Sequence, residues 1–396
     1  MRNTEYDTLV PIQKQALLDG HSLIVWYTNR NRNDMPKNAT ESTEHEPGSS
    51  ADAIRKTSSE KEITTLASNE NPFGPSPRAV AAAQAALNTA NFYPERSDSK
   101  LCNALATFHG RNLTAKHFFA ANSGVEVLSL IEETSIKADQ GAIICPPCFG
   151  AYSPSLEKKS AKIQQVWLSE DFAVNTEALL AAVGPGTRLV YLCNPNNPTG
   201  SWFGEDVLKS ILDGLPDHVT LIYDEVYFQF ATENGLPDAI KYVLEDRNIV
   251  IVHSFSKAYG LAGMRIGYGI APPRIALKIQ QAKRPFHINS VSMAAAIAAL
   301  DDADHLRTTV DNNHAERIRL TQELPVRGLE VTPSQANFIM FKCPEGKDAA
   351  HLTQDLAALG VMVRPAFNLK HHIRATIGTH ENNTRLLAAL DTILEA

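Results

Sequence analysis

The chain has 396 residues, which is too long for one compact core and predicts two domains. Its formal net charge of −7 argues against a nucleic-acid-binding protein, which would need a basic surface. Hydrophobic residues make up 43% of the chain but never form the run of ~20 that spans a bilayer, so the composition is typical of a soluble globular protein.

The first 62 residues differ in composition from the rest. The opening MRNTEYDTLV lacks the basic, apolar and small-residue order of a signal peptide, so we expect a cytoplasmic protein. Residues 28–62 are dominated by Asn, Ser, Thr, Glu and Lys, which bury too little apolar surface to offset the entropy of ordering. We predict that residues 1–62 form a flexible arm; an ordered arm that docks on a partner subunit is the alternative.

From Thr64 onward the pattern becomes regular. Helices are predicted over 77–90, which begins at a proline, and over 124–138. Short runs rich in Val and Ile then alternate with helix-length segments, at 141–145, 188–193, 219–224, 248–254 and 265–271. This alternation predicts a mostly parallel, seven-stranded type of sheet covered on both faces, in a large α/β domain over 91–285.

The pattern changes again after Pro285. Two long helices are followed by apolar runs at 336–343, 360–364 and 373–378 and by a last helix over 381–395. We therefore predict a smaller α+β domain over 286–396, to which residues 63–90 contribute.

The five cysteines are scattered and odd in number, which predicts reduced thiols. Cys145 and Cys148 have the spacing of a redox or zinc motif. Because two prolines separate them and no second pair follows, the sequence favours a loop that happens to hold two cysteines, and no metal site is predicted.

Polar residues gather where three predicted strands end. CNPNNPTG (193–200), YDEVYFQF (223–230) and HSFSKAYGLAGMRIG (253–267) each begin within or follow an apolar run. Any one of them could be an ordinary loop or a helix cap. Ligands bind beyond the carboxyl ends of such strands, so three clusters on three consecutive strands indicate one site.

The chemistry of these residues is mutually consistent with a pyridine cofactor. A pyridine acts as an electron sink when a carboxylate keeps its nitrogen protonated, and Asp224 suits that role. Asn197 and Tyr227 can bond a ring hydroxyl.

A phosphate and a Schiff base could be held nearby. The helix start at 124, with Ser254, Ser256 and Arg265, offers the amides, hydroxyls and guanidinium that a phosphate requires. Lys257, beside Arg265, is suited to form a Schiff base if its charge is disfavoured by a water-poor cleft.

On these motifs, together with ASNENPFGPSP (67–77) and IRATIGTHENN (373–383), the chain resembles the fold-type I transferases that depend on pyridoxal 5′-phosphate (PLP). Within them it is most similar to the histidinol-phosphate aminotransferase family. The resemblance covers Thr64 to the C-terminus, and the stretch from Ser256 to Tyr268 is its most specific part.

The resemblance implies a role for each matching position. Lys257 would carry PLP, with Asp224 and Tyr227 as its catalytic partners. The cofactor-binding positions would be Gly124, Val125, Phe149, Asn197, Asp224, Tyr227, Ser254, Ser256, Arg265 and Tyr93. The substrate-binding positions would be Arg374, Arg364 and Asn69. Tyr93 resembles a tyrosine that reaches the neighbouring subunit's phosphate, which implies a homodimer with shared active sites.

The implied reaction moves an amino group from histidinol phosphate or an aromatic amino acid to a 2-oxo acid such as 2-oxoglutarate. Two departures bear on the donor: residues 50–62 lack the tyrosine that helps family members hold the substrate phosphate, and Val125 replaces a common acidic residue. The alternatives are a PLP-dependent decarboxylase of the threonine-phosphate kind, another PLP enzyme of a specialised pathway, and a non-catalytic aminotransferase-like module.

Overall fold

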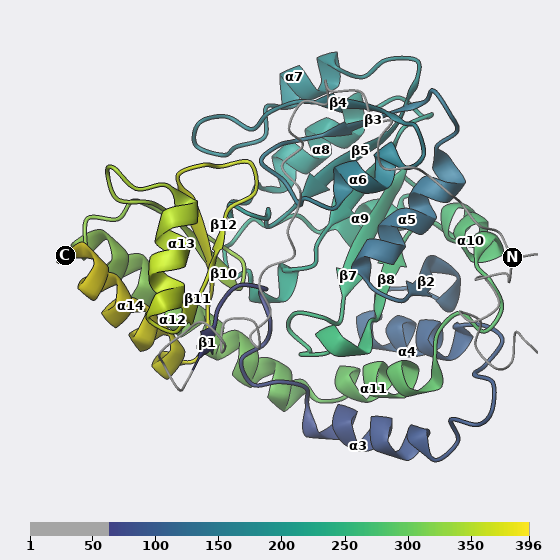
Figure 1. Cartoon of the computed structure of the whole chain (residues 1–396). Helices are drawn as coiled ribbons and strands as arrows, with labels where there is room; N and C mark the ends of the chain where they lie inside the picture. Colours follow the sequence, from purple (N-terminus) through teal and green to yellow (C-terminus); the bar gives the residue numbers. More distant parts are fainter. Residues whose placement is uncertain (1–62, 396) are drawn as a thin grey trace, which may run out of the picture. The chain divides into compact units, whose positions relative to one another are not determined.

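A seven-stranded sheet forms the centre of the larger part of the chain (Figure 1). The computed structural model describes residues 63–395. In spatial order the strands are β2 (Phe118–Ala121), β8 (Gly267–Ile270), β7 (Ile249–Ser254), β6 (Thr220–Asp224), β5 (Thr187–Cys193), β3 (Gly141–Ile144) and β4 (Lys162–Gln165). Only β8 among them runs antiparallel to its neighbours. The predicted mostly parallel sheet is confirmed, although the sequence did not predict β2 and β4.

Helices cover both faces of this sheet, as its apolar strands require. One face packs against α5 (Gly124–Ser135), α6 (Tyr152–Glu157) and α10 (Pro273–Ala282). The other face packs against α4 (Ser99–His109), α7 (Thr176–Ala181), α8 (Glu205–Gly214), α9 (Ala239–Leu244) and α11 (Ser290–Leu300). Short 3-10 helices lie at Ala115–His117, Phe228–Phe230 and Ala262–Met264.

A second core lies around a four-stranded sheet with antiparallel pairing. Its strands, in spatial order, are β12 (Arg364–Pro365), β13 (His372–Thr376), β10 (Phe338–Lys342) and β9 (Val331–Thr332). The helices packed there are α12 (Ala303–Val326), α13 (Ala349–Ala358) and α14 (His380–Leu394). A parallel pair of β1 (Thr64–Thr65) and β11 (Val361–Met362) ties the first described residues to this core.

The two cores divide the chain differently from the limits that the sequence suggested. Helix α3 (Pro77–Leu87) packs along α11, and Ala79 and Ala83 lie in the same apolar cluster as Ala295 and Ala296. That cluster packs on one face of the seven-stranded sheet. Packing therefore places α3 and α11 with the large sheet, whereas the sequence grouped 63–90 and everything after 285 with the small domain.

Residues 63–395 contain no helix that is both long enough and apolar enough to cross a membrane. The arm predicted over 1–62 lies outside the described residues.

Candidate active site

The sheet topology brings the three polar clusters together. Strands β5, β6 and β7 are adjacent and parallel, with Cys193 paired in register to Asp224 and Asp224 to Val252. Their carboxyl ends therefore lie side by side at one edge, where an α/β sheet binds its ligand.

Asp224 ends β6 in a buried position. Its Oδ2 accepts a hydrogen bond from the hydroxyl of Tyr152 at 2.7 Å, and its Oδ1 accepts one from the backbone N–H of Val226 at 3.2 Å. Burial raises the pKa of Asp224 to about 6, against the lowering effect of these bonds. A buried carboxylate in this state gains from a cationic partner such as a protonated ring nitrogen. Sequence reasoning missed Tyr152; its only signal was its place three residues after Phe149.

Lys257 lies half-buried, with its Nζ donating to the backbone oxygen of Ser68 at 3.0 Å. The same nitrogen is 5.9 Å from the centroid of the Tyr227 ring. Burial, and next the positive charge of Arg374, lower the pKa of Lys257 to about 7. Near neutral pH a large share of the amine is therefore unprotonated, as a Schiff-base or proton-accepting lysine requires.

The Tyr227 hydroxyl is held by two amides. It accepts from the Nδ2 of Asn69 at 3.1 Å and from the Nδ2 of Asn197 at 3.2 Å. Burial raises the pKa of Tyr227, so the phenol keeps its proton and can donate it to a third group. Asn69, which the sequence assigned to the substrate, thus lies against a predicted cofactor residue.

The residues predicted to bind a phosphate lie around the start of α5. Ser123 caps the helix by accepting from the N–H of Glu126 at 3.2 Å. A Cβ added to Gly267 would lie 2.6 Å from the backbone nitrogen of Gly124, which shows how closely β8 approaches the helix start. A Cβ added to Gly124 would in turn lie 3.6 Å from the Cβ of Ser254. The unpaired N–H groups of the helix start and the Ser254 hydroxyl therefore face one place, as a phosphate requires.

Ser256 and Arg265 extend this surface. The N–H of Ser256 donates to Ser254 Oγ at 3.1 Å, which fixes the turn that leads to Lys257. Arg265 has a left-handed backbone with φ of 51°, and its guanidinium donates to the Ala262 carbonyl at 2.9 Å. Val125, exposed on the first turn of α5, can contribute only its backbone amide to an anion.

Arg364 and Arg374 lie directly opposite each other on the antiparallel strands β12 and β13. Arg374 is buried and donates to Asn197 Oδ1 and to the Ala67 carbonyl, both at 2.8 Å. Both guanidiniums lie over the ring of Phe367, at 5.3 Å for Arg364 and 5.5 Å for Arg374.

The charges of these two arginines are not balanced within residues 63–395. Neither has a carboxylate partner among those residues, and the Nε of Arg374 is buried without a hydrogen-bond partner. Burial lowers the pKa of Arg374 to about 10, which leaves it charged at neutral pH. Arg374 is buried and Arg364 is half-buried, and two adjacent cations with neutral partners are suited to bind an anionic ligand.

The two remaining predicted positions differ in location. Phe149 is half-buried, with its ring edge-on to Tyr152 at 5.6 Å and to Phe367 at 6.4 Å, close to Asp224. Tyr93 is not brought to the site within one chain: it is 86% exposed and contacts the ring of Phe286 at 5.3 Å.

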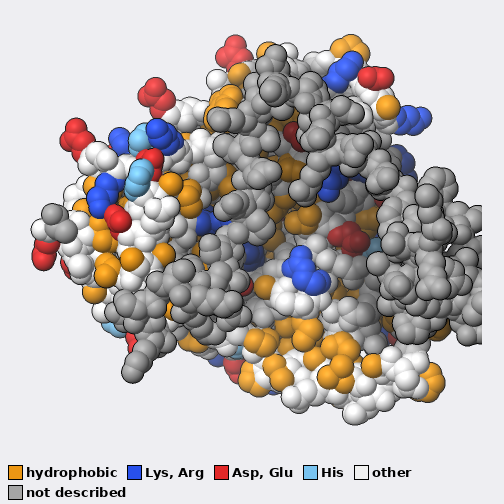
Figure 2. Space-filling model, in the orientation of Figure 1, with side chains coloured by type: hydrophobic (Ala, Val, Ile, Leu, Met, Phe, Trp, Pro, Cys, Tyr) orange, Lys and Arg blue, Asp and Glu red, His pale blue; other side chains and the backbone are white. Residues whose placement is uncertain are grey.

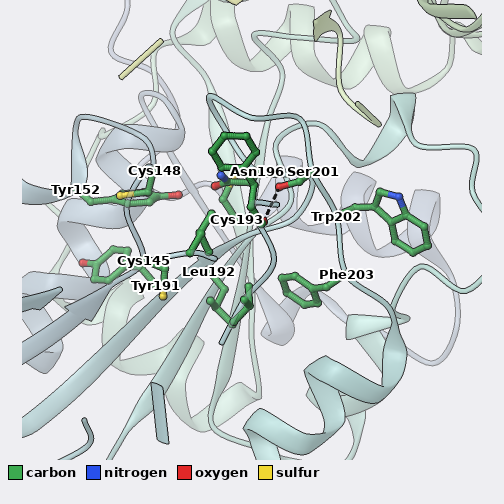
Figure 3. A pocket seen from close by; sticks show the side chains of 13 residues that line it. Cys145, Cys148, Tyr152, Tyr191, Leu192, Cys193, Asn196, Ser201, Trp202 and Phe203 are labelled. Carbon is green, nitrogen blue, oxygen red and sulfur yellow. Dashed lines mark hydrogen bonds between the residues drawn. The ribbon is translucent and has the colours of Figure 1, made fainter. Parts of the chain in front are cut away.

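A cavity of about 20 Å³ lies beneath Tyr152 (Figure 3). Cys145, Cys148 and Cys193 line it, and all three are buried free thiols. Burial raises the pKa of Cys145 and Cys148 to about 12, which keeps them protonated and unreactive. Residues 63–395 contain no group of three or more His, Cys, Asp or Glu side chains that could hold a metal ion.

The residues at this edge fit PLP on their own chemistry. A buried carboxylate would face the ring nitrogen, Tyr227 and Asn197 the ring hydroxyl, and the start of α5 the phosphate, while Lys257 supplies an amine that is partly neutral near pH 7.

Residues 61–390 match the model of the family described as aminotransferase class I and II. Histidinol-phosphate aminotransferase 1 of Nitrosococcus oceani is 35% identical over 355 residues, covering 89% of this chain and 95% of that protein. Histidinol-phosphate aminotransferase of Akkermansia muciniphila is 37% identical, covering 84% of this chain and 90% of that protein.

Solved structures agree. Histidinol-phosphate aminotransferase from Sinorhizobium meliloti, in complex with pyridoxal-5′-phosphate, has a TM-score of 0.80 and 27% identity, covering 88% of this chain and 95% of that one. Aspartate aminotransferase from Thermus thermophilus shares the fold, with a TM-score of 0.76 at 20% identity and coverage of 88% and 97%. The predicted fold-type I architecture is confirmed. The chain belongs to the aminotransferase class I and II family and is a PLP-dependent aminotransferase.

Proposed function

We propose that this aminotransferase takes its amino group from histidinol phosphate or an aromatic amino acid and passes it to a 2-oxo acid such as 2-oxoglutarate. The observation that carries the proposal is the opposed pair of Arg364 and Arg374, which lies near Lys257 and has no carboxylate partner within residues 63–395. An ammonium-bearing donor with an anionic group would supply the missing charge. The histidinol-phosphate aminotransferases at 35% and 37% identity support this donor class.

Each site residue has a role in this reaction. Bound PLP supplies an electron sink for the charge that develops at the substrate α-carbon. Asp224 holds the proton on the ring nitrogen, and Tyr227 with Asn197 orients the ring hydroxyl. Arg374 grips a carboxylate of the 2-oxo acid or of an aromatic donor, and the neutral Lys257 amine accepts the proton from the amine-bearing carbon of the donor and later returns it.

Arg364 gives the site a second cation for a donor with another anionic group. Its guanidinium lies over Phe367, whose ring also contacts Arg374 and Phe149. A donor phosphate at Arg364 and a carboxylate of the acceptor at Arg374 would both lie beside the rings of Phe367 and Phe149. This arrangement would compensate for the tyrosine that residues 50–62 lack.

We also propose that two chains form a homodimer with shared sites. Hydrophobic side chains gather over α3 in Figure 2, and exposed apolar residues continue beyond that helix. Val80, Leu87, Phe92 and Tyr93 are the exposed members of this segment. An apolar patch rimmed by polar groups is typical of an interface, and it would carry Tyr93 to the phosphate site of the partner.

A panel of amino donors with 2-oxoglutarate tests the donor class. Histidinol phosphate, an aromatic amino acid and phosphothreonine are offered in turn, and formation of glutamate and release of carbon dioxide are measured. Glutamate formation with histidinol phosphate or the aromatic donor supports the proposal. Carbon dioxide from phosphothreonine without any need for 2-oxoglutarate would replace it with the decarboxylase reaction.

A further inference from the structure

A continuous chain of buried hydrogen bonds lies behind the cofactor residues, and the reaction described above does not use it. Glu225 Oε2 lies 3.0 Å from His253 Nε2, and His253 Nδ1 lies 2.8 Å from the Tyr268 hydroxyl. That hydroxyl lies 3.0 Å from the Nε2 of His109 on α4. His253 and Tyr268 are almost completely buried.

Three members of this hydrogen-bond network are sequence neighbours of three parts of the predicted cofactor site. Glu225 follows Asp224, His253 precedes Ser254, and Tyr268 follows Gly267, which packs on the start of α5. Successive side chains of a strand point to opposite faces of the sheet. The site and the hydrogen-bond chain are therefore carried by the same strand ends.

The pairing register ties these strand ends together. His253 is the direct partner of Tyr268, and Ser254 is the direct partner of Gly267. On the other side, the N–H of Glu225 donates to the carbonyl of Val252 at 3.0 Å, which links the end of β6 to β7. Loss of the side-chain bonds would leave the strands paired but would free their last residues to shift.

The protonation states of these side chains give every hydrogen bond of the network one donor and one acceptor. Burial raises the pKa of Glu225 to about 8 and lowers the pKa of His253 to about 3. Near neutral pH Glu225 can therefore donate to His253, His253 to Tyr268, and Tyr268 to His109, whose pKa burial also lowers to about 3. A buried polar network in which every member is satisfied holds its groups in one arrangement.

We propose that Glu225, His253 and Tyr268 are positioning residues that hold Asp224, Ser254 and the Gly124–Gly267 contact in the geometry that binds PLP. Their side chains point to the face of the sheet opposite that of Asp224 and Ser254, so they act through these residues and not by contact with the cofactor. The proposal rests on the assignment of Asp224, Ser254 and the start of α5 to the cofactor. It does not depend on the identity of the amino donor.

Tyr268→Phe tests the proposal because it removes one hydroxyl and keeps the ring. It leaves His253 without an acceptor and His109 without a donor. The matched control is Tyr242→Phe on α9, which removes a tyrosine-to-carboxylate bond to Glu205 and leaves every bond between Glu225, His253, Tyr268 and His109 in place. The readouts are the Kd of PLP for the apoprotein, from absorbance titration, and the Tm of the apoprotein.

We expect Tyr268→Phe to raise the Kd of PLP about tenfold, as loss of a buried hydrogen bond next to a binding site would. Tyr268→Phe and Tyr242→Phe should both lower the Tm of the apoprotein by a similar amount, because each loses the hydrogen bonding of one tyrosine hydroxyl. Only Tyr268→Phe should change the Kd of PLP. A Kd that is unchanged in Tyr268→Phe, or raised equally in both variants, overturns the proposal.

A second pair of variants separates hydrogen bonding from packing at Glu225. The amide of Glu225→Gln can still donate to His253, so its Kd should stay within about threefold of the wild type, whereas Glu225→Leu should bind PLP about tenfold more weakly. Equal weakening in both variants contradicts a positioning role. If the wild type binds PLP but uses neither proposed donor, the donor assignment fails and these comparisons still stand.

Discussion

Arg374 and Tyr227 are connected through a single side chain, that of Asn197. Arg374 donates to the Asn197 oxygen at 2.8 Å, and the amide nitrogen of Asn197 donates to the Tyr227 hydroxyl at 3.2 Å. The residue proposed to grip the substrate carboxylate is thereby held in place by the residues proposed to bond the cofactor hydroxyl. With these roles, one short, buried hydrogen-bond path would set the position of the substrate relative to the cofactor ring.

Replacing Arg374 by lysine should lower kcat/KM for glutamate by about 100-fold, because an ammonium cannot form two parallel bonds to a carboxylate and also reach Asn197 and Ala67. The Kd of PLP should change little. Steady-state kinetics and a PLP titration measure both quantities. Arg307→Lys on the exposed surface of α12 is the control, and equal kinetics in wild type and Arg374→Lys would show that the arginine does not bind substrate.

Asp224→Asn should stabilise the apoprotein while it removes activity. The folded pKa of Asp224, about 6, lies above its ordinary value of 3.8. Between pH 3.8 and pH 6 the folded protein keeps the proton of Asp224, whereas the unfolded chain has lost it. Asp224 therefore increasingly destabilises the fold as pH rises from 3.8 to 6, and the destabilisation is complete above pH 6.

The gain from Asp224→Asn should be about 3 kcal/mol at pH 8 and should shrink as pH falls below 6. Urea unfolding of the apoprotein at several pH values measures it, with the exposed Asp206→Asn as control for the loss of a charge. A variant that is less stable than the wild type at pH 8 would show that Asp224 carries no burial penalty. Aminotransferase activity should fall by a factor on the order of 10²–10³.

The Lys257 amine of the apoprotein should react with an acylating reagent at ordinary pH. Because its pKa is lowered to about 7, the neutral fraction, and with it the rate, should level off above pH 8. Ordinary surface lysines, which titrate near 10.4, keep gaining reactivity over the same range. Peptide mass spectrometry at pH 6 to 9 follows both, and a Lys257 rate that still climbs steeply at pH 9 would rule out the lowered pKa.

Mixing two defective variants should restore activity if sites are shared between subunits. Lys257→Ala lacks the amine, and Tyr93→Ala lacks the side chain proposed to reach the partner. A mixed dimer would contain one site with both defects and one site with neither. Refolding the two variants together should therefore give transamination that neither gives alone, and no gain over the separate variants would place Tyr93 outside the shared site.

The class of chemistry can be predicted from the order of residues along the chain. The order and spacing of residues 193–200, 223–230 and 253–267 identify three adjacent strand ends, because ligand residues of parallel sheets follow their strands directly in the chain. The main strands were predicted for a similar reason, since buried parallel strands are continuous apolar runs. β4, whose sequence is KIQQ and whose residues are mostly exposed, carries no such run and was missed.

Features that depend on contacts between distant segments become visible only in the folded protein. Tyr152 reaches Asp224 over 72 positions, and Asn69 reaches Tyr227 over 158. The pKa values of Lys257 and Asp224 follow from burial, which residue spacing does not encode. Helix α3 joins the large core because its alanines pack on α11, more than 200 residues away. The sequence predicted which groups take part in the chemistry, whereas their charge, their partners and their positions follow from packing between segments that are far apart in the chain.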